Sequence, residues 1–263
     1  MIAMPPTAPP HLAHQYDALF YRYQREGSLR SARVVLPIVA NACAINSILD
    51  IGCGAGAWLS VANAIGLQDI AGVDGNYVDR SLLLFDPASF TPYDISKLFE
   101  MGRKFDLVQC MEVAEHVPEA YATTLVRNIV HHGRLVIFSA AVPGQGGENH
   151  INEQPYEYWR NLFSLHGYRL FDFVRPRTIK NRDVEPWYRY NLLLFAHDSV
   201  IHRLPNEVAI TRVPDHDRIR DYSPPVYRLR KAILRQLPNT FVDKLATWKH
   251  QRSVRALKPD NGD

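Results

Sequence analysis

Cysteines are scarce in this sequence, and their spacing does not suggest a disulfide framework. Cys43, Cys53 and Cys110 are the only three among 263 residues, and no two of them form a C-x-x-C pair. A secreted domain stabilised by disulfides carries several cysteines at short, regular spacings. The pattern instead indicates a protein of a reducing compartment.

The sequence also lacks a secretory signal, a membrane-spanning run and an internal repeat. Residues 1–15 are rich in proline and contain no basic stretch followed by an apolar one. The apolar segment 32–45 is interrupted by Pro37 and Asn41, and it is too short to cross a bilayer. We therefore expect a cytoplasmic protein without a membrane span.

Charge is distributed unevenly along the chain. The formal net charge is +3, but residues 201–263 contain thirteen Lys and Arg against seven Asp and Glu, which leaves residues 1–200 acidic. Apolar residues recur among these basic ones, and this is typical of amphipathic helices that pack on another surface. The basic segment therefore favours packing or homo-oligomer contacts over nucleic-acid binding.

A short apolar strand runs directly into a glycine-rich loop at residues 47–56, which read Ser-Ile-Leu-Asp-Ile-Gly-Cys-Gly-Ala-Gly. Gly52, Gly54 and Gly56 allow a sharp turn and leave room for a ligand against main-chain N–H groups at the start of the next helix. A dinucleotide-binding loop has the spacing G-x-G-x-x-G, and here the third glycine comes one residue early. The spacing argues against a nicotinamide or flavin enzyme.

Strand-like and helix-like segments alternate along the chain, and this alternation predicts an α/β fold. The expected architecture is a Rossmann-like, seven-stranded, mostly parallel sheet with helices on both faces. We place strands at residues 47–51, 69–74, 89–92, 105–111, 134–140, 167–175 and 188–197.

The order of motifs resembles that of the class I S-adenosylmethionine-dependent methyltransferases. Asp50 and the glycines resemble motif I, and Asp74 in Ala-Gly-Val-Asp-Gly ends a second apolar strand. Residues 105–110 resemble the fourth strand of that family, Glu-Val-Ala-Glu-His at 112–116 follows it, and residues 133–139 resemble the fifth strand. The resemblance covers roughly residues 28–198 and implies S-adenosyl-L-methionine as cofactor, with S-adenosyl-L-homocysteine as product.

The resemblance assigns cofactor-binding residues by position. Asp74 would accept hydrogen bonds from both ribose hydroxyls, residues 94–95 would contact adenine, and residues 110–111 would lie beside the donor. Tyr21 is expected at the methionine end and is also a catalytic candidate. The full cofactor set is Asp50, Gly52, Gly54, Gly56, Asp74, Asp94, Ile95, Cys110, Met111 and Tyr21.

Three domains follow from these patterns. Residues 1–27 contain an aromatic segment, which in the family commonly folds over the cofactor as a lid, and a helix is expected from about Leu29 to Ala42. Residues 28–198 form the methyltransferase domain. Residues 199–263 form a basic, helical C-terminal extension, with residues 213–225 as its approach.

His116 is the first candidate for a general base, because it follows the fourth strand at the edge where open α/β sheets bind ligands. Glu115 could orient the imidazole or share its role, and His150 in the later glycine-rich loop could contact the acceptor or act as a second base. The alternative is structural: Glu115 and His116 would stabilise the helix that begins near Pro118, and His150 would bond locally.

A metal site is a further alternative. Glu112, Glu115 and His116 form E-x-x-E-H, which resembles the metal-ligating motif of ubiquinone-pathway O-methyltransferases and, with a later histidine, that of small-RNA methyltransferases. With His150 these residues would bind a divalent ion that chelates two acceptor oxygens. The motif also occurs in metal-free relatives, so the preferred interpretation assigns no metal.

The segment 144–154 contains three glycines followed by polar residues, and it suggests a mobile loop that closes over the acceptor. Aromatic residues could form walls for a ring-containing acceptor, although we expect most of them in the core. They are Tyr156, Tyr158, Trp159, Trp187, Tyr188 and Tyr190.

The leading function is methylation of a small metabolite or natural product that contains an aromatic or sugar ring. The methylated atom would be an oxygen, a nitrogen or a nucleophilic carbon such as that of an indole ring. An RNA methyltransferase would need a basic, aromatic groove, whereas residues 1–200 are slightly acidic. A non-catalytic scaffold of the same fold is the third hypothesis, and the intact Asp50, Asp74 and glycines argue against it.

Overall fold

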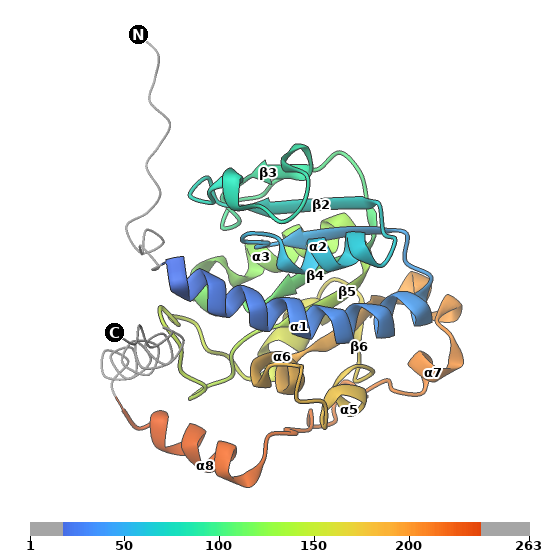
Figure 1. Cartoon of the computed structure of the whole chain (residues 1–263). Coiled ribbons are helices and arrows are strands. Elements are labelled where there is room, and N and C mark those ends of the chain that lie inside the picture. The colour runs from blue at the N-terminus through green and yellow to red at the C-terminus, as the bar shows by residue number, and fades with distance from the viewer. Residues whose placement is uncertain (1–17, 238–263) are drawn as a thin grey trace, which may run out of the picture.

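The computed structural model describes residues 18–237, with side chains from residue 25 onward, and its centre is one seven-stranded sheet (Figure 1). The strand order is β3-β2-β1-β4-β5-β7-β6. Six of the seven strands run in the same direction. The exception is β7, which pairs antiparallel with both β5 and β6. The predicted α/β architecture, seven-stranded and mostly parallel, is confirmed.

Continuous apolar runs account for the central strands, because both faces of these strands are covered. Every residue of β1 is buried, and β4 and β5 each expose only their second residue. The strands are β1 Ser47–Ile51, β2 Asp69–Asp74, β3 Phe90–Pro92, β4 Phe105–Met111, β5 Gly133–Ser139, β6 Tyr168–Phe171 and β7 Leu193–His197.

Helices cover both faces of the sheet (Figure 1). On one face α1, α2 and α6 enclose a core that includes Val35, Trp58 and Tyr188, and on the other α3 and α4 enclose a core that includes Ile129 and Phe163. The helices are α1 Ala18–Cys43, α2 Ala57–Ala64, α3 Ala122–His132, α4 Tyr156–Ser164, α5 Arg175–Thr178, α6 Pro186–Asn191, α7 Asn206–Ala209 and α8 Pro225–Leu234. Short 3₁₀ turns lie at 80–82, 87–89, 114–116, 119–121 and 198–203.

The predicted ends of the last two strands are wrong. β6 ends at Phe171, because Arg175-Pro176 begins the short helix α5, and proline at the first turn of a helix costs no hydrogen bond. β7 begins only at Leu193, because Pro186 starts α6 and residues 188–191 belong to that helix. The helix expected over 29–42 is longer, since α1 continues from Ala18 to Cys43 through Pro37.

The described residues after 198 pack back onto the rest of the fold. Arg160 of α4 donates to the Asp217 carbonyl at 2.6 Å, and within the segment itself Lys231 of α8 donates to the Asp221 carboxylate at 2.7 Å. Arg230 of α8 and Arg235, directly after α8, donate to carbonyls of the loop that follows β5. In the part of the chain that the structure describes, no helix is long and apolar enough to span a membrane.

Candidate active site

The glycine-rich turn after β1 has the predicted backbone geometry. Gly52, Gly54 and Gly56 have φ values of 81°, 52° and 77°, a region that L-residues with side chains rarely adopt. A Cβ atom on Gly56 would lie 2.2 Å from the Phe85 ring, whereas one on Gly54 would meet no heavy atom within 4 Å. Gly56 is therefore required by close packing, and Gly54 borders the open space where a cofactor would fit.

Asp74 stands at the carboxyl end of β2 and faces this turn. Its carboxylate accepts hydrogen bonds from the N–H groups of Gly54 and Gly75, both at 2.7 Å, and from the Tyr77 hydroxyl at 2.5 Å. The residue is 5% exposed, and burial raises its pKa. A carboxylate offers about four acceptor positions, so Asp74 keeps acceptor capacity for a ribose hydroxyl.

Asp50 lies between Asp74 and the fourth strand. It pairs in register with Gly72 of β2 and Gln109 of β4, which places it in the middle of the sheet near its carboxyl edge. Burial raises the pKa of Asp50 to about 7, and the nearby Asp74 charge acts in the same direction. The site therefore holds two buried carboxyl groups where a sulfonium donor would bring a positive charge, and such a charge would favour their ionised forms.

The remaining residues assigned to the cofactor have different surroundings. Met111 ends β4, and its sulfur lies 4.0 Å from the Ser139 hydroxyl. The Cys110 side chain is completely buried in the core on the α3 face, so only its backbone can border the cofactor space. The Asp94 carboxylate accepts hydrogen bonds from Ser96, and Ile95 packs beside that core. The side chain of Tyr21 lies outside the described residues.

Two carboxyl groups meet just after β4. Glu112 has a φ of 55°, and its Oε2 accepts a hydrogen bond from Gln145 Nε2 at 3.1 Å. Glu115 is fully buried, and its Oε1 accepts from the Ala141 N–H at 3.1 Å. Glu112 Oε1 and Glu115 Oε2 are enclosed and accept no hydrogen bond from any other described residue, and the two carboxyl groups interact with each other. Strained backbone and buried carboxyl pairs of this kind cluster at functional sites.

Burial raises the pKa of both carboxyl groups, and the Glu112 charge raises that of Glu115 further, well above its ordinary value. Two adjacent carboxylates cannot easily both ionise in such surroundings. Burial and the neighbouring charge therefore favour a pair that carries one negative charge rather than two, with the proton on Glu115.

His116 and His150 complete the cluster. Their rings lie 5.0 Å apart at 84°, and Glu115, His116 and His150 each bring one ligand atom within 4.8 Å of the others. His116 Nδ1 lies 3.1 Å from the Asn149 carbonyl, and a carbonyl can only accept, so Nδ1 carries the proton. Burial lowers the pKa of His116 to about 4, with the neighbouring His150 acting in the same direction, so His116 is neutral at pH 7.

His150 has a carboxylate partner. Its Nδ1 lies 2.9 Å from Glu153 Oε1, and Glu153 also accepts hydrogen bonds from the N–H groups of Gly144 and Gly146, both at 2.7 Å. The N–H groups of Ile151 and Asn152 both donate to the Glu115 carbonyl at 3.0 Å. These contacts hold the loop in place, so no closure of the loop is needed to bring His150 to Glu115.

A cavity of about 270 Å³ lies beside His150. The loop after β5 forms one wall, and Leu234, Arg235 and Leu237 at the end of α8 form another. Glu119 contributes a carboxylate at the rim. None of the six predicted aromatic residues lines this cavity, and four of them, Tyr156, Trp159, Tyr188 and Tyr190, are at most 8% exposed and belong to the core.

Three contacts were not predicted from the sequence. Gln145 links Glu112 to Asn191 of α6, Tyr77 donates to Asp74, and the Phe85 ring covers Gly56. Tyr77 comes three residues after a motif aspartate, and this spacing is the one signal that could have indicated it.

Residues 20–181 match the protein family described as a methyltransferase domain, and this match spans more than half of the chain. The chain belongs to this family. It is a class I methyltransferase, an enzyme whose cofactor is S-adenosyl-L-methionine.

Among curated proteins, the methyltransferase is 26% identical to the ubiquinone biosynthesis O-methyltransferase of Pseudomonas syringae pv. tomato, over 62% of this chain and 71% of that protein. Among solved structures, it is similar to a sugar N-methyltransferase from Streptoalloteichus sp, with a TM-score of 0.53, 18% identity and coverage of 75% and 99%. An O-methyltransferase family protein from Burkholderia thailandensis gives a TM-score of 0.50 at 12% identity, with coverage of 69% and 57%. The two structural likenesses show the fold.

Proposed function

We propose that this methyltransferase acts on a polar small molecule that binds in the cavity beside His150. One observation carries the proposal: His150 belongs both to the cluster with Glu115 and His116 and to the wall of the cavity. Asn152, Gln154 and Glu119 give that wall hydrogen-bonding groups, which suit a hydroxylated or amino-bearing acceptor such as a sugar-containing natural product.

His150 is a better candidate for the general base than His116. His116, with a pKa of about 4, is unprotonated at pH 7, but so weak a base takes up a proton poorly. His150 donates from Nδ1 to the Glu153 carboxylate, which orients the ring and stabilises the imidazolium that forms when Nε2 takes a proton.

The chemical step is then an in-line displacement. The acceptor oxygen or nitrogen attacks the methyl carbon, the carbon–sulfur bond breaks, and S-adenosyl-L-homocysteine leaves. The proton of the acceptor passes to His150. Holding donor and acceptor in line supplies most of the acceleration, and a positioned base adds about 10²–10⁴-fold.

A metal-assisted route is the second candidate, because the donor set fits a divalent ion. Glu115, His116 and His150 each bring one ligand atom within 4.8 Å of the others, and both histidines have Nδ1 engaged, which leaves Nε2 for a ligand. Mixed imidazole and carboxylate donors suit Mn²⁺, Fe²⁺, Co²⁺ or Zn²⁺. A bound ion would lower the pKa of an acceptor hydroxyl. The Glu153 contact to His150 is the kind of hydrogen bond that orients a ligating histidine.

An RNA acceptor has less support from the site. The described walls of the cavity place Glu119 and Glu153 beside the single cation Arg235, whereas a groove for RNA backbone carries an excess of positive charge. We further infer that residues 28–198 are the catalytic unit and that the extension 199–263 supplies one wall of its cavity. Subunit contacts through this extension, and a cytoplasmic location, stay predictions.

The test is transfer of a labelled methyl group. The protein is incubated with methyl-labelled S-adenosyl-L-methionine and a metabolite extract of its source organism, and labelled products are identified by mass spectrometry. We expect a polar small-molecule product, and we expect H150Q to lower its formation at least about 10²-fold without weakening S-adenosyl-L-homocysteine binding. Label found only in RNA, or full activity of H150Q, would contradict the proposal.

A further inference from the structure

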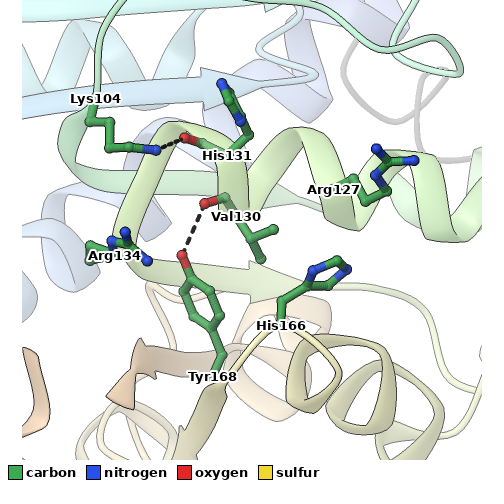
Figure 2. Close-up of a pocket in the computed structure, with 7 residues that line it drawn as sticks. All are labelled: Lys104, Arg127, Val130, His131, Arg134, His166 and Tyr168. Atoms are coloured by element: carbon green, nitrogen blue, oxygen red, sulfur yellow. Dashed lines mark hydrogen bonds between the residues drawn. The ribbon is translucent and has the colours of Figure 1, made fainter. Parts of the chain in front are cut away.

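A second cavity, of about 280 Å³, lies at the amino ends of β4 and β5, opposite the strand ends that carry the candidate active site (Figure 2). Lys104 directly precedes β4, Arg134 is the second residue of β5, and Val130 and His131 belong to the end of α3. The proposed catalytic cluster follows the far end of β4, and a strand of that length spans about 20 Å. The cavity therefore lies outside the cofactor and acceptor sites.

Nitrogen-bearing side chains dominate the lining of this cavity. Lys104, Arg127 and Arg134 are fixed cations, and His131 and His166 add two imidazoles. No acidic side chain belongs to the lining. This composition is unusual in a part of the chain whose net charge is slightly negative, and it concentrates positive potential in a concave surface.

Part of this charge is explained by the end of α3. A helix C-terminus carries roughly half a negative charge, and its last carbonyls lack helical partners. Lys104 Nζ donates to the His131 carbonyl, and the Tyr168 hydroxyl donates to the Val130 carbonyl at 3.1 Å (Figure 2). His131 also pairs with Glu100 at 2.8 Å. Lys104, Tyr168 and His131 are therefore accounted for by contacts within the protein.

Arg127 and Arg134 are not accounted for in this way. Neither guanidinium group forms a hydrogen bond or an ion pair with any residue whose side chain the structure describes, from 25 to 237. Both are exposed, and they come from different elements, α3 and β5, on either side of Val130. Both arginines line the same cavity, and a guanidinium group can bind a phosphate group through two N–H donors.

We propose that this cavity binds a phosphate-bearing anion, with Arg127 and Arg134 as the principal ligands. Lys104 and His166 add positive charge or N–H donors at the rim. The shared chemistry is the phosphate group itself, which could belong to free diphosphate or to a phosphorylated metabolite. The cavity would hold this anion while the methyltransferase site remains accessible.

The test is calorimetric titration of the full chain with inorganic phosphate, pyrophosphate and ADP at fixed salt concentration. The variant R127Q/R134Q removes the two principal ligands. The control K180Q/R182Q removes the same charge from exposed positions elsewhere. S-adenosyl-L-homocysteine binding, measured for each protein, reports whether the fold is intact.

We expect pyrophosphate to bind the wild-type protein, and R127Q/R134Q to weaken it at least about tenfold while K180Q/R182Q changes it less than about twofold. Tighter binding of ADP than of pyrophosphate would identify a nucleotide, and equal binding would identify the diphosphate group alone. The proposal would be overturned if the wild-type protein bound no pyrophosphate at a concentration tenfold above about 1 mM. An equal loss of binding in both variants would also overturn it.

Discussion

Gln145 donates a hydrogen bond from Nε2 to Glu112 Oε2 at 3.1 Å, and its own Oε1 accepts one from Asn191 Nδ2 at 2.8 Å. Its backbone carbonyl accepts from Arg230 of α8 at 2.9 Å. Gln145 therefore connects the carboxyl group after β4 to α6 and to the C-terminal extension. Since Gln145 is 7% exposed, no bulk water can replace these contacts without rearrangement.

Replacing Gln145 with Leu should disturb Glu112 directly. The change leaves Glu112 Oε2 and the Asn191 amide without partners, and each unsatisfied buried group costs about 1–3 kcal/mol. We expect a lower free energy of unfolding in urea and a reduced rate of methyl transfer, with unchanged S-adenosyl-L-homocysteine affinity. The same substitution at the exposed Gln68 is the control. Equal stability and activity of Q145L and Q68L would show that the contact has no role.

The metal-assisted route requires that the carboxylate–histidine cluster bind one divalent transition ion. Titration with Co²⁺, followed by its visible absorption, should saturate at one equivalent in the wild-type protein. In H116A and E115Q the affinity should fall by more than the roughly 10–100-fold that the loss of a supporting contact costs. His131 to Ala, in the distant cavity, is the control. A wild-type protein that leaves the Co²⁺ spectrum unchanged would exclude the metal-assisted route and retain the metal-free one.

Asp74 should determine cofactor affinity. Its replacement by Ala removes the acceptor for the ribose hydroxyls and frees the Gly54 N–H, so we expect binding of S-adenosyl-L-homocysteine to weaken by about 1–3 kcal/mol in calorimetry. Tyr77 to Phe removes only the hydroxyl that donates to Asp74, and it should weaken binding less. If D74A binds as tightly as the wild-type protein, Asp74 does not hold the ribose.

Asp50 should make the protein less stable as the pH rises. Its pKa is about 7 in the folded protein and about 4 in an unfolded chain, so between these values the folded state binds the proton more tightly. The free energy of unfolding should therefore fall as pH rises from about 4 to 7, by an amount of the order of 4 kcal/mol at most. Urea unfolding at pH 5 and pH 8 measures it.

Asp50 to Asn separates this contribution from those of Asp74, Glu112 and Glu115, whose raised pKa values act in the same direction. The variant keeps those three groups but cannot ionise at position 50. Its stability relative to the wild-type protein should rise between pH 5 and pH 8. A difference that does not change with pH would show that Asp50 is not the buried acid described above.

The strands that could be predicted well are those whose signals are local. β1, β2 and β4 have the predicted bounds, because each is a continuous apolar run that ends in a motif residue. The end of β6 and the start of β7 could not be predicted. The apolar run of β6 continues toward α5, and that of β7 begins within α6, so only Pro176 and Pro186 signal the two changes.

The candidate site shows the same division. His150 and Glu153 lie three residues apart in one loop, so their pairing could have been derived from spacing. Gln145 meets Glu112 across 33 residues and Asn191 across 46, and only the folded sheet brings these amides together. The role of Gln145 could therefore not be predicted without the fold.

The glycines of the turn after β1 should differ in what they tolerate. Gly56 to Ala places a Cβ 2.2 Å from the Phe85 ring at a φ of 77°, so it combines a steric clash with left-handed strain and should lower the melting temperature strongly. Gly54 to Ala meets no atom within 4 Å and has only the strain at a φ of 52°, of the order of 1–2 kcal/mol.

The two variants should separate folding from cofactor binding. In G54A the new methyl group enters the space beside the N–H group that donates a hydrogen bond to Asp74. Binding of S-adenosyl-L-homocysteine should therefore weaken even where the protein is fully folded. G56A combined with Phe85 to Ala should regain part of the stability lost in G56A, because the clash is removed and only the strain remains. Thermal unfolding of the single and double variants measures this recovery. If G56A and G54A are equally stable, Phe85 is not what requires a glycine at position 56.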